Sequence, residues 1–208
     1  MIPVPPLADV VTEALTGVAS ALEGPVHALA LILALLLVLE TGRAASEAAR
    51  RLRPGRPRLL AVAAGALANP GRAPEFARAA PGALAEQAVR GMAEARATGR
   101  PDAVEDALAD YELHVQRRLD RTRMLVRAGP AVGLMGTLIP LGPGIAALGR
   151  GDVAALAGDL RTAFAATVLG ILVGTVAFAL TLIRTRTATE DLAALERAAR
   201  VPVDQTAG

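Results

Sequence analysis

Side chains that could carry out acid–base, nucleophilic or metal chemistry are few in this chain and lie far apart. There is no cysteine, which excludes disulfides, thiolate metal sites and a cysteine nucleophile. His27 and His114 are distant in the sequence, and neither has a second ligand at metal-binding spacing. No Gly-x-Ser-x-Gly elbow or phosphate-binding P-loop is present. We therefore expect no enzyme activity, no metal and no cofactor, and we interpret both histidines as structural.

Two long stretches, Ala128–Gly149 and Ala163–Ile183, contain no Asp, Glu, Lys, Arg or His. No side-chain relay inside them could carry a proton, so a titratable group needed there would have to come from another chain. Each stretch is long enough to cross a bilayer, whose hydrocarbon core needs about 20 apolar residues. A third apolar run, Pro25–Leu39, is too short alone but extends to a span of about residues 20–40.

Small residues recur at steps of three and four in both charge-free stretches, so each helix would collect them in one narrow stripe. The first stripe holds Gly129, Gly133, Gly136, Pro140, Pro143 and Ala147, and the second holds Ala163, Thr167, Gly170, Gly174, Ala177 and Thr181. Membrane helices associate through close contacts that small residues permit. We expect each stripe to face another helix or a narrow passage, with these helix-packing residues: Gly129, Gly133, Gly136, Pro140, Ala163, Gly170, Gly174 and Ala177.

Breaker residues predict how the helices begin and end. Gly24-Pro25 indicates a helix start, because proline fits the first turn. Breakers at 54–57, 69–71 and 99–101 divide the largest soluble part into helical pieces, the last of which is expected to run directly into the second span. Pro140 and its neighbours would weaken or kink that span, so a re-entrant loop is the alternative there.

The chain is therefore predicted to be an all-α integral membrane protein with three transmembrane helices and a helical cytoplasmic loop, helices 2 and 3 extending into the cytoplasm. Its expected parts are an extracytoplasmic amphipathic segment (1–24), the core of transmembrane helix 1 (25–40), a cytoplasmic helical domain (41–127), transmembrane helix 2 (128–149), an extracytoplasmic hairpin (150–162), transmembrane helix 3 (163–183) and a cytoplasmic tail (184–208) with a short amphipathic helix.

Arginine placement predicts the orientation. All 22 basic residues are arginine, and residues 1–24 contain none. The positive-inside rule counts basic residues near the membrane ends. Those flanking the central loop are Arg43, Arg50, Arg51, Arg53, Arg56, Arg58, Arg117, Arg118, Arg121, Arg123 and Arg127. We therefore expect a protein of the cell (inner) membrane. Its N-terminus would lie outside, and its central loop and C-terminus would lie in the cytoplasm. Nucleic-acid binding is the rival interpretation of this loop, but interspersed acids and few aromatics argue against it.

Glu40, at the end of the first span, has two interpretations. It could sense protons, or it could be a terminal carboxylate that snorkels to water. We favour the second.

Two motifs, in order, resemble those of the MotA/TolQ/ExbB proton-channel family. Gly133-Leu134-Met135-Gly136-Thr137 is similar to the family's G-L-x-G-T run in its second span, and Ala163–Ile171 (AFAATVLGI) is similar to its A-L-x-x-T-x-x-G-L run in the third. The resemblance covers roughly residues 129–186 and the three-span layout. The chain departs from the family at Thr162, where some members have an acidic residue, and in the Pro140–Pro143 pair.

This resemblance implies an ion-channel subunit, for protons first of all, of a membrane motor complex. Such subunits form a ring, usually a homopentamer, around a single-span ExbD/TolR/MotB-like partner. An intramembrane aspartate of the partner carries the proton, and ion-motive force is coupled to mechanical work. A non-conducting membrane scaffold, packed through the small-residue stripes, is the alternative. A membrane enzyme acting on lipid headgroups is a third candidate, but the chain has no carboxylate or histidine constellation for it.

The same resemblance implies that Thr137 and Thr167 line the passage. A hydroxyl there could hold water or solvate a transiently charged carboxylate. The alternative is that each hydroxyl bonds the backbone of its own helix. With the boundaries above, the two threonines lie at different depths, and they become level only if the third helix begins earlier, near Ala155.

Overall fold

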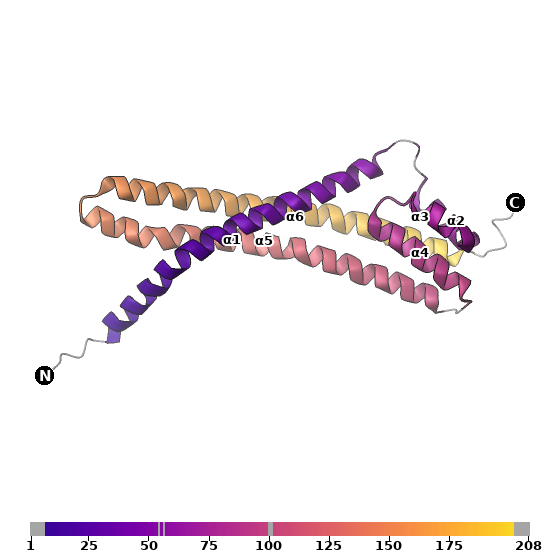
Figure 1. Ribbon diagram of the computed structural model, residues 1–208, viewed down its shortest axis with the longest axis horizontal. Coiled ribbons are helices and arrows are strands. Elements are labelled where there is room, and N and C mark those ends of the chain that lie inside the picture. The colour runs from indigo at the N-terminus through magenta and orange to yellow at the C-terminus, as the bar shows by residue number, and fades with distance from the viewer. Residues whose placement is uncertain (1–6, 54, 56, 100–101, 202–208) are drawn as a thin grey trace. The chain divides into compact units, whose positions relative to one another are not determined.

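The structure is a computed structural model and describes residues 7–53, 55, 57–99 and 102–201. Within these residues it consists of helices joined by short connections (Figure 1). They are α1 (Leu7–Arg51), α2 (Leu59–Ala68), the 3₁₀ turn η1 (Pro70–Arg72), α3 (Ala73–Ala77), α4 (Ala83–Ala97), α5 (Ala103–Gly149) and α6 (Val153–Arg200). The first six residues of the expected amphipathic segment and the last seven of the tail lie outside the described part of the chain.

Three of these helices, α1, α5 and α6, are long and apolar enough to cross a membrane. The prediction of an all-α membrane protein with three transmembrane helices is therefore confirmed. The chain forms two compact units, and each long helix contributes to both. Unit 1 contains α1 up to Leu39, α5 from Arg123 and α6 up to Phe178, and unit 2 contains the remaining helical residues.

In unit 1, α5 and α6 form an antiparallel hairpin closed by Arg150–Asp152 (Figure 1). Gly151 has a φ of +81°, a conformation that glycine adopts without strain. Asp152 caps α6, because its Oδ1 accepts a hydrogen bond of 2.9 Å from the backbone N–H of Ala155. Helix α6 therefore begins at Val153, and most of the connection expected over residues 150–162 is helical.

Glycines allow the backbones of α5 and α6 to touch. A Cβ atom added to Gly170 would lie 2.5 Å from the carbonyl oxygen of Gly129 and 2.7 Å from Cα of Gly133. A Cβ on Gly174 would lie 2.8 Å from Cδ of Pro130. These distances leave no room for a side chain, so the register of the hairpin depends on glycine at these positions.

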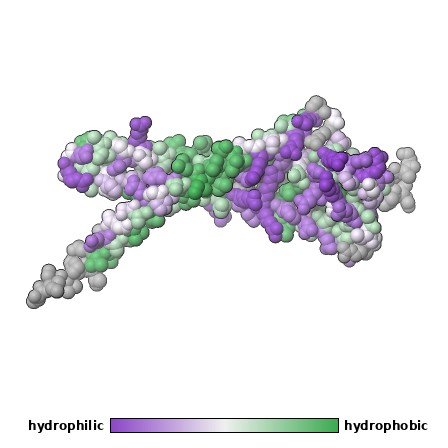
Figure 2. All heavy atoms as spheres, in the orientation of Figure 1, coloured by the Kyte–Doolittle hydropathy of each residue, from purple (hydrophilic) through white to green (hydrophobic). Residues whose placement is uncertain are grey.

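The first part of α1 joins this hairpin through a stripe at helical spacing, formed by the buried residues Val26, Ala30, Leu33 and Leu37. Cγ1 of Val26 lies 3.9 Å from the place a Cβ on Gly136 would take. The outer faces of the three helices are apolar and exposed, as at Leu31, Leu138 and Phe164. Figure 2 shows a broad hydrophobic patch over parts of the long helices. Such faces suit contact with lipid acyl chains.

Prolines do not interrupt the long helices. Helix α1 passes through Pro25, so the helix start expected there is wrong. Helix α5 passes through Pro130, Pro140 and Pro143, so the alternative of a re-entrant loop is wrong as well. Each proline removes one backbone donor, and neighbouring helices stabilise transmembrane helices against that loss. The tail helix is also not separate, because α6 continues to Arg200.

Unit 2 has its own apolar core between α2, α3 and α4, to which α5 and α6 contribute. The breakers expected near residues 54, 70 and 100 do separate its helices, and α5 does run without a break into the apolar stretch that begins at Ala128, as predicted. Deeply buried core side chains include Val62, Ala66, Ala77, Val89, Met92, Ala93 and Leu195. The C-terminal part of α6 is thus fixed by apolar packing.

A buried ion pair in unit 2 joins α1 to α6. The guanidinium of Arg184 lies 2.6 Å from the carboxylate of Glu40, and both side chains are less than a tenth exposed. Arg184 also donates a hydrogen bond of 3.3 Å to the backbone oxygen of Glu40, and Arg43 adds a second ion pair at 3.0 Å. The expectation that the Glu40 carboxylate reaches water is therefore wrong, because α1 and α6 pack against each other at this position.

We predict that Gly170→Ala destabilises the protein by about 1–3 kcal/mol, because the new methyl would collide with backbone atoms of α5 that cannot rotate away. Gly142→Ala is the matched control, since a Cβ there meets nothing within 4 Å and the gain in helix propensity is the same. Detergent-induced unfolding of the two purified variants measures their free energies of unfolding. Equal stability of the two variants would contradict the close contact.

We predict that Glu40→Gln lowers the free energy of unfolding by about 3–5 kcal/mol, because it leaves the Arg184 charge buried without its carboxylate. Replacing both partners in Glu40→Leu/Arg184→Met should recover most of the loss. Glu190→Gln is the control, since its ion pair with Arg186 is exposed and worth less than about 1 kcal/mol. The same unfolding assay would refute burial of the pair if Glu40→Gln behaved like the control.

Candidate functional site

Thr137 on α5 and Thr167 on α6 are both partly buried beside the line of contact between these helices. Thr167 Oγ1 donates a hydrogen bond of 3.5 Å to the backbone oxygen of Gly133, on the opposite helix. The residues that directly precede the two threonines face each other across the hairpin, because a Cβ on Gly136 would lie 2.6 Å from Cβ of Ala166. The structure therefore brings Thr137 and Thr167 to about the same level in unit 1.

The early start of α6 explains this level arrangement. In an antiparallel hairpin with a short turn, residues at similar separations from the turn lie opposite each other. Thr137 and Thr167 are about equally far from Arg150–Asp152. The difference in depth expected from the sequence depended on a third helix that begins at Ala163, whereas α6, capped by Asp152, begins ten residues earlier.

Each threonine hydroxyl already uses its proton inside the protein. Thr137 Oγ1 donates to the backbone oxygen of Leu134 at 2.7 Å, which is the own-helix bond considered as the alternative role. Thr167 instead bonds across the hairpin. A hydroxyl oxygen that donates once still has lone pairs that accept. The pair can therefore accept hydrogen bonds from water or from a protonated carboxylic acid.

The residues expected to pack helices lie along the same line of contact. Cβ atoms added to Gly129, Gly133 and Gly136 would each meet atoms of α6 within 3.2 Å, and Gly170 and Gly174 face α5 in return. The remaining residues of this prediction, Pro140, Ala163 and Ala177, are buried. Within a single chain, the two small-residue stripes thus contact each other.

The two histidines both bond to the backbone of their own helix. His27 Nδ1 lies 2.8 Å from the oxygen of Glu23, and His114 Nδ1 lies 2.6 Å from the oxygen of Asp110. Within the described part of the chain, no group of three or more His, Cys, Asp or Glu residues could hold a metal ion.

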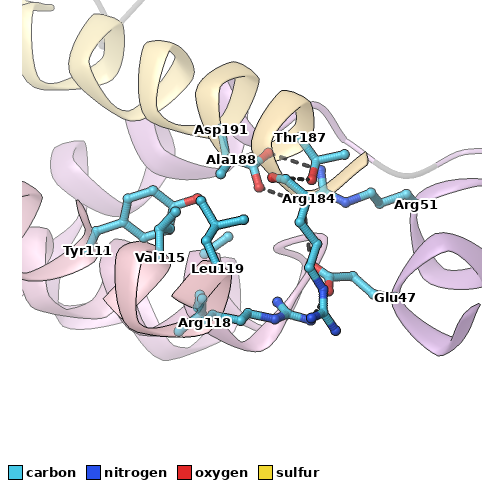
Figure 3. Close-up of a pocket in the computed structure, with 12 residues that line it drawn as sticks. Glu47, Arg51, Tyr111, Val115, Arg118, Leu119, Arg184, Thr187, Ala188 and Asp191 are labelled. Atoms are coloured by element: carbon cyan, nitrogen blue, oxygen red, sulfur yellow. Dashed lines mark hydrogen bonds and ion pairs between the residues drawn. The ribbon is translucent and has the colours of Figure 1, made fainter. Parts of the chain in front are cut away.

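Sequence reasoning missed a cluster of charged side chains in unit 2 (Figure 3). Arg51 of α1 donates two hydrogen bonds to Asp191 of α6, at 3.0 and 2.5 Å. Arg118 of α5 donates one of 2.6 Å to Glu47 of α1. These partners are far apart in the sequence, so only the packing of three helices reveals them. In the sequence, the one indication of such pairs was that residues of opposite charge occur beyond the ends of the apolar stretches.

The charged cluster surrounds a small cavity of about 30 Å³, lined also by Tyr111 and Arg184 (Figure 3). This is roughly room for one or two water molecules. The hydrogen bonds from Asp191 raise the pKa of Arg51. Burial raises the pKa of the Tyr111 phenol far above its usual value. Both groups therefore keep their protons near neutral pH, and the ion pairs of the cluster join α1, α5 and α6 within unit 2.

The profile of the MotA/TolQ/ExbB proton channel family matches residues 78–196, which is more than half of the chain. No curated protein and no solved structure matches it. The matched residues include α4, α5 and nearly all of α6, and with them both threonines and all the glycines of the α5–α6 contact. With three helices able to cross a membrane and this match over its helical hairpin, the chain belongs to the MotA/TolQ/ExbB proton channel family and is a multi-pass membrane protein.

Proposed function

We propose that this chain is a proton-channel subunit of a membrane motor. Several copies, five by analogy with the family, form a ring around a single-span partner that carries an intramembrane aspartate, and ion flow through the ring drives mechanical work. Family membership supports the channel role. The rest of the proposal is supported by one observation. Thr137 and Thr167 lie at about the same level along the hairpin, in helical segments that hold no titratable side chain.

The missing titratable group explains why a partner is required. A permanently charged residue inside the bilayer costs several kcal/mol, whereas a hydroxyl does not. A protonated carboxylic acid from the partner can donate to the free lone pairs of a threonine. After the proton leaves, the hydroxyl can rotate and donate to the carboxylate. The threonine pair thus stabilises both protonation states of an acid that the chain itself lacks.

The orientation and the membrane boundaries form part of this proposal. The arginines around the central loop favour a cytoplasmic position for residues 41–127 and for the tail, in an inner-membrane protein with its N-terminus outside. The spans are 25–40, 128–149 and 163–183. Because α6 begins at Val153, its first turns would then extend the third span at the extracytoplasmic side.

A non-conducting scaffold remains the second candidate, and one observation favours it. The two small-residue stripes contact each other within one chain, so they need not line a passage. Proton flux decides between the two functions, because a scaffold assembles without conducting.

We predict that Thr167→Val reduces proton flux roughly 10- to 100-fold, because the partner's acid loses a hydrogen bond that nothing replaces. Thr167→Ser, which keeps the hydroxyl, should retain flux. Thr185→Val is the control, since this exposed hydroxyl bonds its own helix at Thr181. Flux is measured in vesicles containing the chain together with the single-span protein that copurifies with it. Wild-type flux in Thr167→Val would contradict the proposed role of this residue.

We predict that native mass spectrometry of the purified complex finds several copies of the chain, five by analogy with the family, with at least one copy of a single-span protein. Glycine contacts inside the chain are untouched by Thr167→Val, so this variant should give the same stoichiometry. A monomeric chain, or proton flux through the chain alone, would contradict the ring around a partner.

A further inference from the structure

Unit 2 contains a second, larger cavity whose lining is rich in arginine. It has a volume of about 620 Å³, within the range of roughly 300–1,000 Å³ typical of small-molecule sites. We call it the arginine groove. Its charged lining comes from α1 and α5 and comprises Glu40, Arg43, Glu47, Arg50, Arg117, Arg118 and Arg121.

The acids of the arginine groove are already neutralised. Glu40 is paired with Arg184 at 2.6 Å and with Arg43 at 3.0 Å, and Glu47 is paired with Arg118 at 2.6 Å and with Arg51 at 3.5 Å. Two of these four arginines, Arg43 and Arg118, line the groove. The five arginines of the groove still outnumber its two glutamates, so its lining keeps a net positive charge. Among the described residues, Arg117 and Arg121 have no ion pair or hydrogen bond.

The N-terminus of α4 opens into the same groove. Its N-cap residue Gly82 and the first two helical residues, Ala83 and Leu84, line the cavity, and no side chain caps the helix. The helix dipole favours negative charge at this end. A carboxylate oxygen of Glu47 already lies close to it, 2.9 Å from the place a Cβ on Gly82 would take. The arginine side chains therefore remain the groups that favour a further ligand with acceptor oxygens and negative charge.

The position of these arginines along their helices points to the membrane surface. Arg43 follows the apolar segment of α1 by about 5 Å of helix rise, and Arg121 and Arg117 precede that of α5 by about 10 and 16 Å. The lipid headgroup layer is about 5–8 Å thick on each side of the hydrocarbon core, and long arginine side chains reach toward it. Basic pockets at this depth suit lipid phosphates.

We propose that the arginine groove binds the phosphate headgroup of an anionic phospholipid. The headgroup phosphate accepts hydrogen bonds from the guanidinium groups of Arg117 and Arg121. This site differs from the threonine pair in residues and chemistry, and it does not depend on proton conduction.

This proposal is tested by measuring lipid binding to the purified chain. The chain is kept in the oligomeric state in which it is extracted from the membrane. Native mass spectrometry follows the titration of phosphatidylglycerol, phosphatidylcholine and inorganic phosphate in separate samples. Arg117→Gln/Arg121→Gln should weaken phosphatidylglycerol binding roughly 10- to 30-fold. Arg127→Gln/Arg186→Gln is the matched control, because it removes two arginines that also flank apolar spans but lie outside the groove. It should change binding less than about twofold.

The proposal is supported if phosphatidylglycerol binds more tightly than phosphatidylcholine and only the groove variant loses this preference. Equal binding of the two lipids would overturn it, as would equal losses in both double variants. Binding of inorganic phosphate as tight as that of phosphatidylglycerol would assign the groove to free phosphate instead. If the groove variant loses a copurifying protein but keeps the lipid, the groove is a protein-docking surface and the proposal is wrong.

Discussion

The contact between the backbones of α5 and α6 is the constraint on which the rest of unit 1 depends. At Gly129 and Gly170 the helices approach so closely that no side chain fits between them, and a Cβ on Gly133 would lie only 3.2 Å from Cα of Gly170. Lipid provides no hydrophobic force to hold apolar helices together, so this contact must do so through van der Waals packing. It also sets the register that brings Thr137 and Thr167 level.

The stretches Ala128–Gly149 and Ala163–Ile183 of this hairpin hold no titratable side chain, so they can offer hydrogen-bond acceptors but no proton carrier. The proposed function follows from that division, in which the chain supplies the polar surface and a second chain supplies the acid. Charge is instead concentrated in unit 2, where Glu40, Arg51, Arg184 and Asp191 are paired and mostly buried. These pairs join α1 to α6 within unit 2.

Much of the fold could be predicted from the sequence, because length and apolar composition determine which helices can cross a membrane. What could not be predicted depends on contacts between distant residues. Helix α1 continues through Pro25 although proline is a strong local breaker. Asp152 caps α6, so this helix begins earlier than expected. The carboxylate of Glu40 is buried because it pairs with Arg184. For the candidate site, the motifs identified the threonines, but only the register of the hairpin revealed that they are level.

A cryo-EM structure of the chain purified with its single-span partner in lipid nanodiscs would test the central claim most directly. The account predicts a partner helix enclosed by α5 and α6 of several copies, with its carboxylate within about 3.2 Å of Thr137 or Thr167 in at least one copy. An assembly in which both hydroxyls face acyl chains, or in which no helix of another chain reaches them, would contradict it.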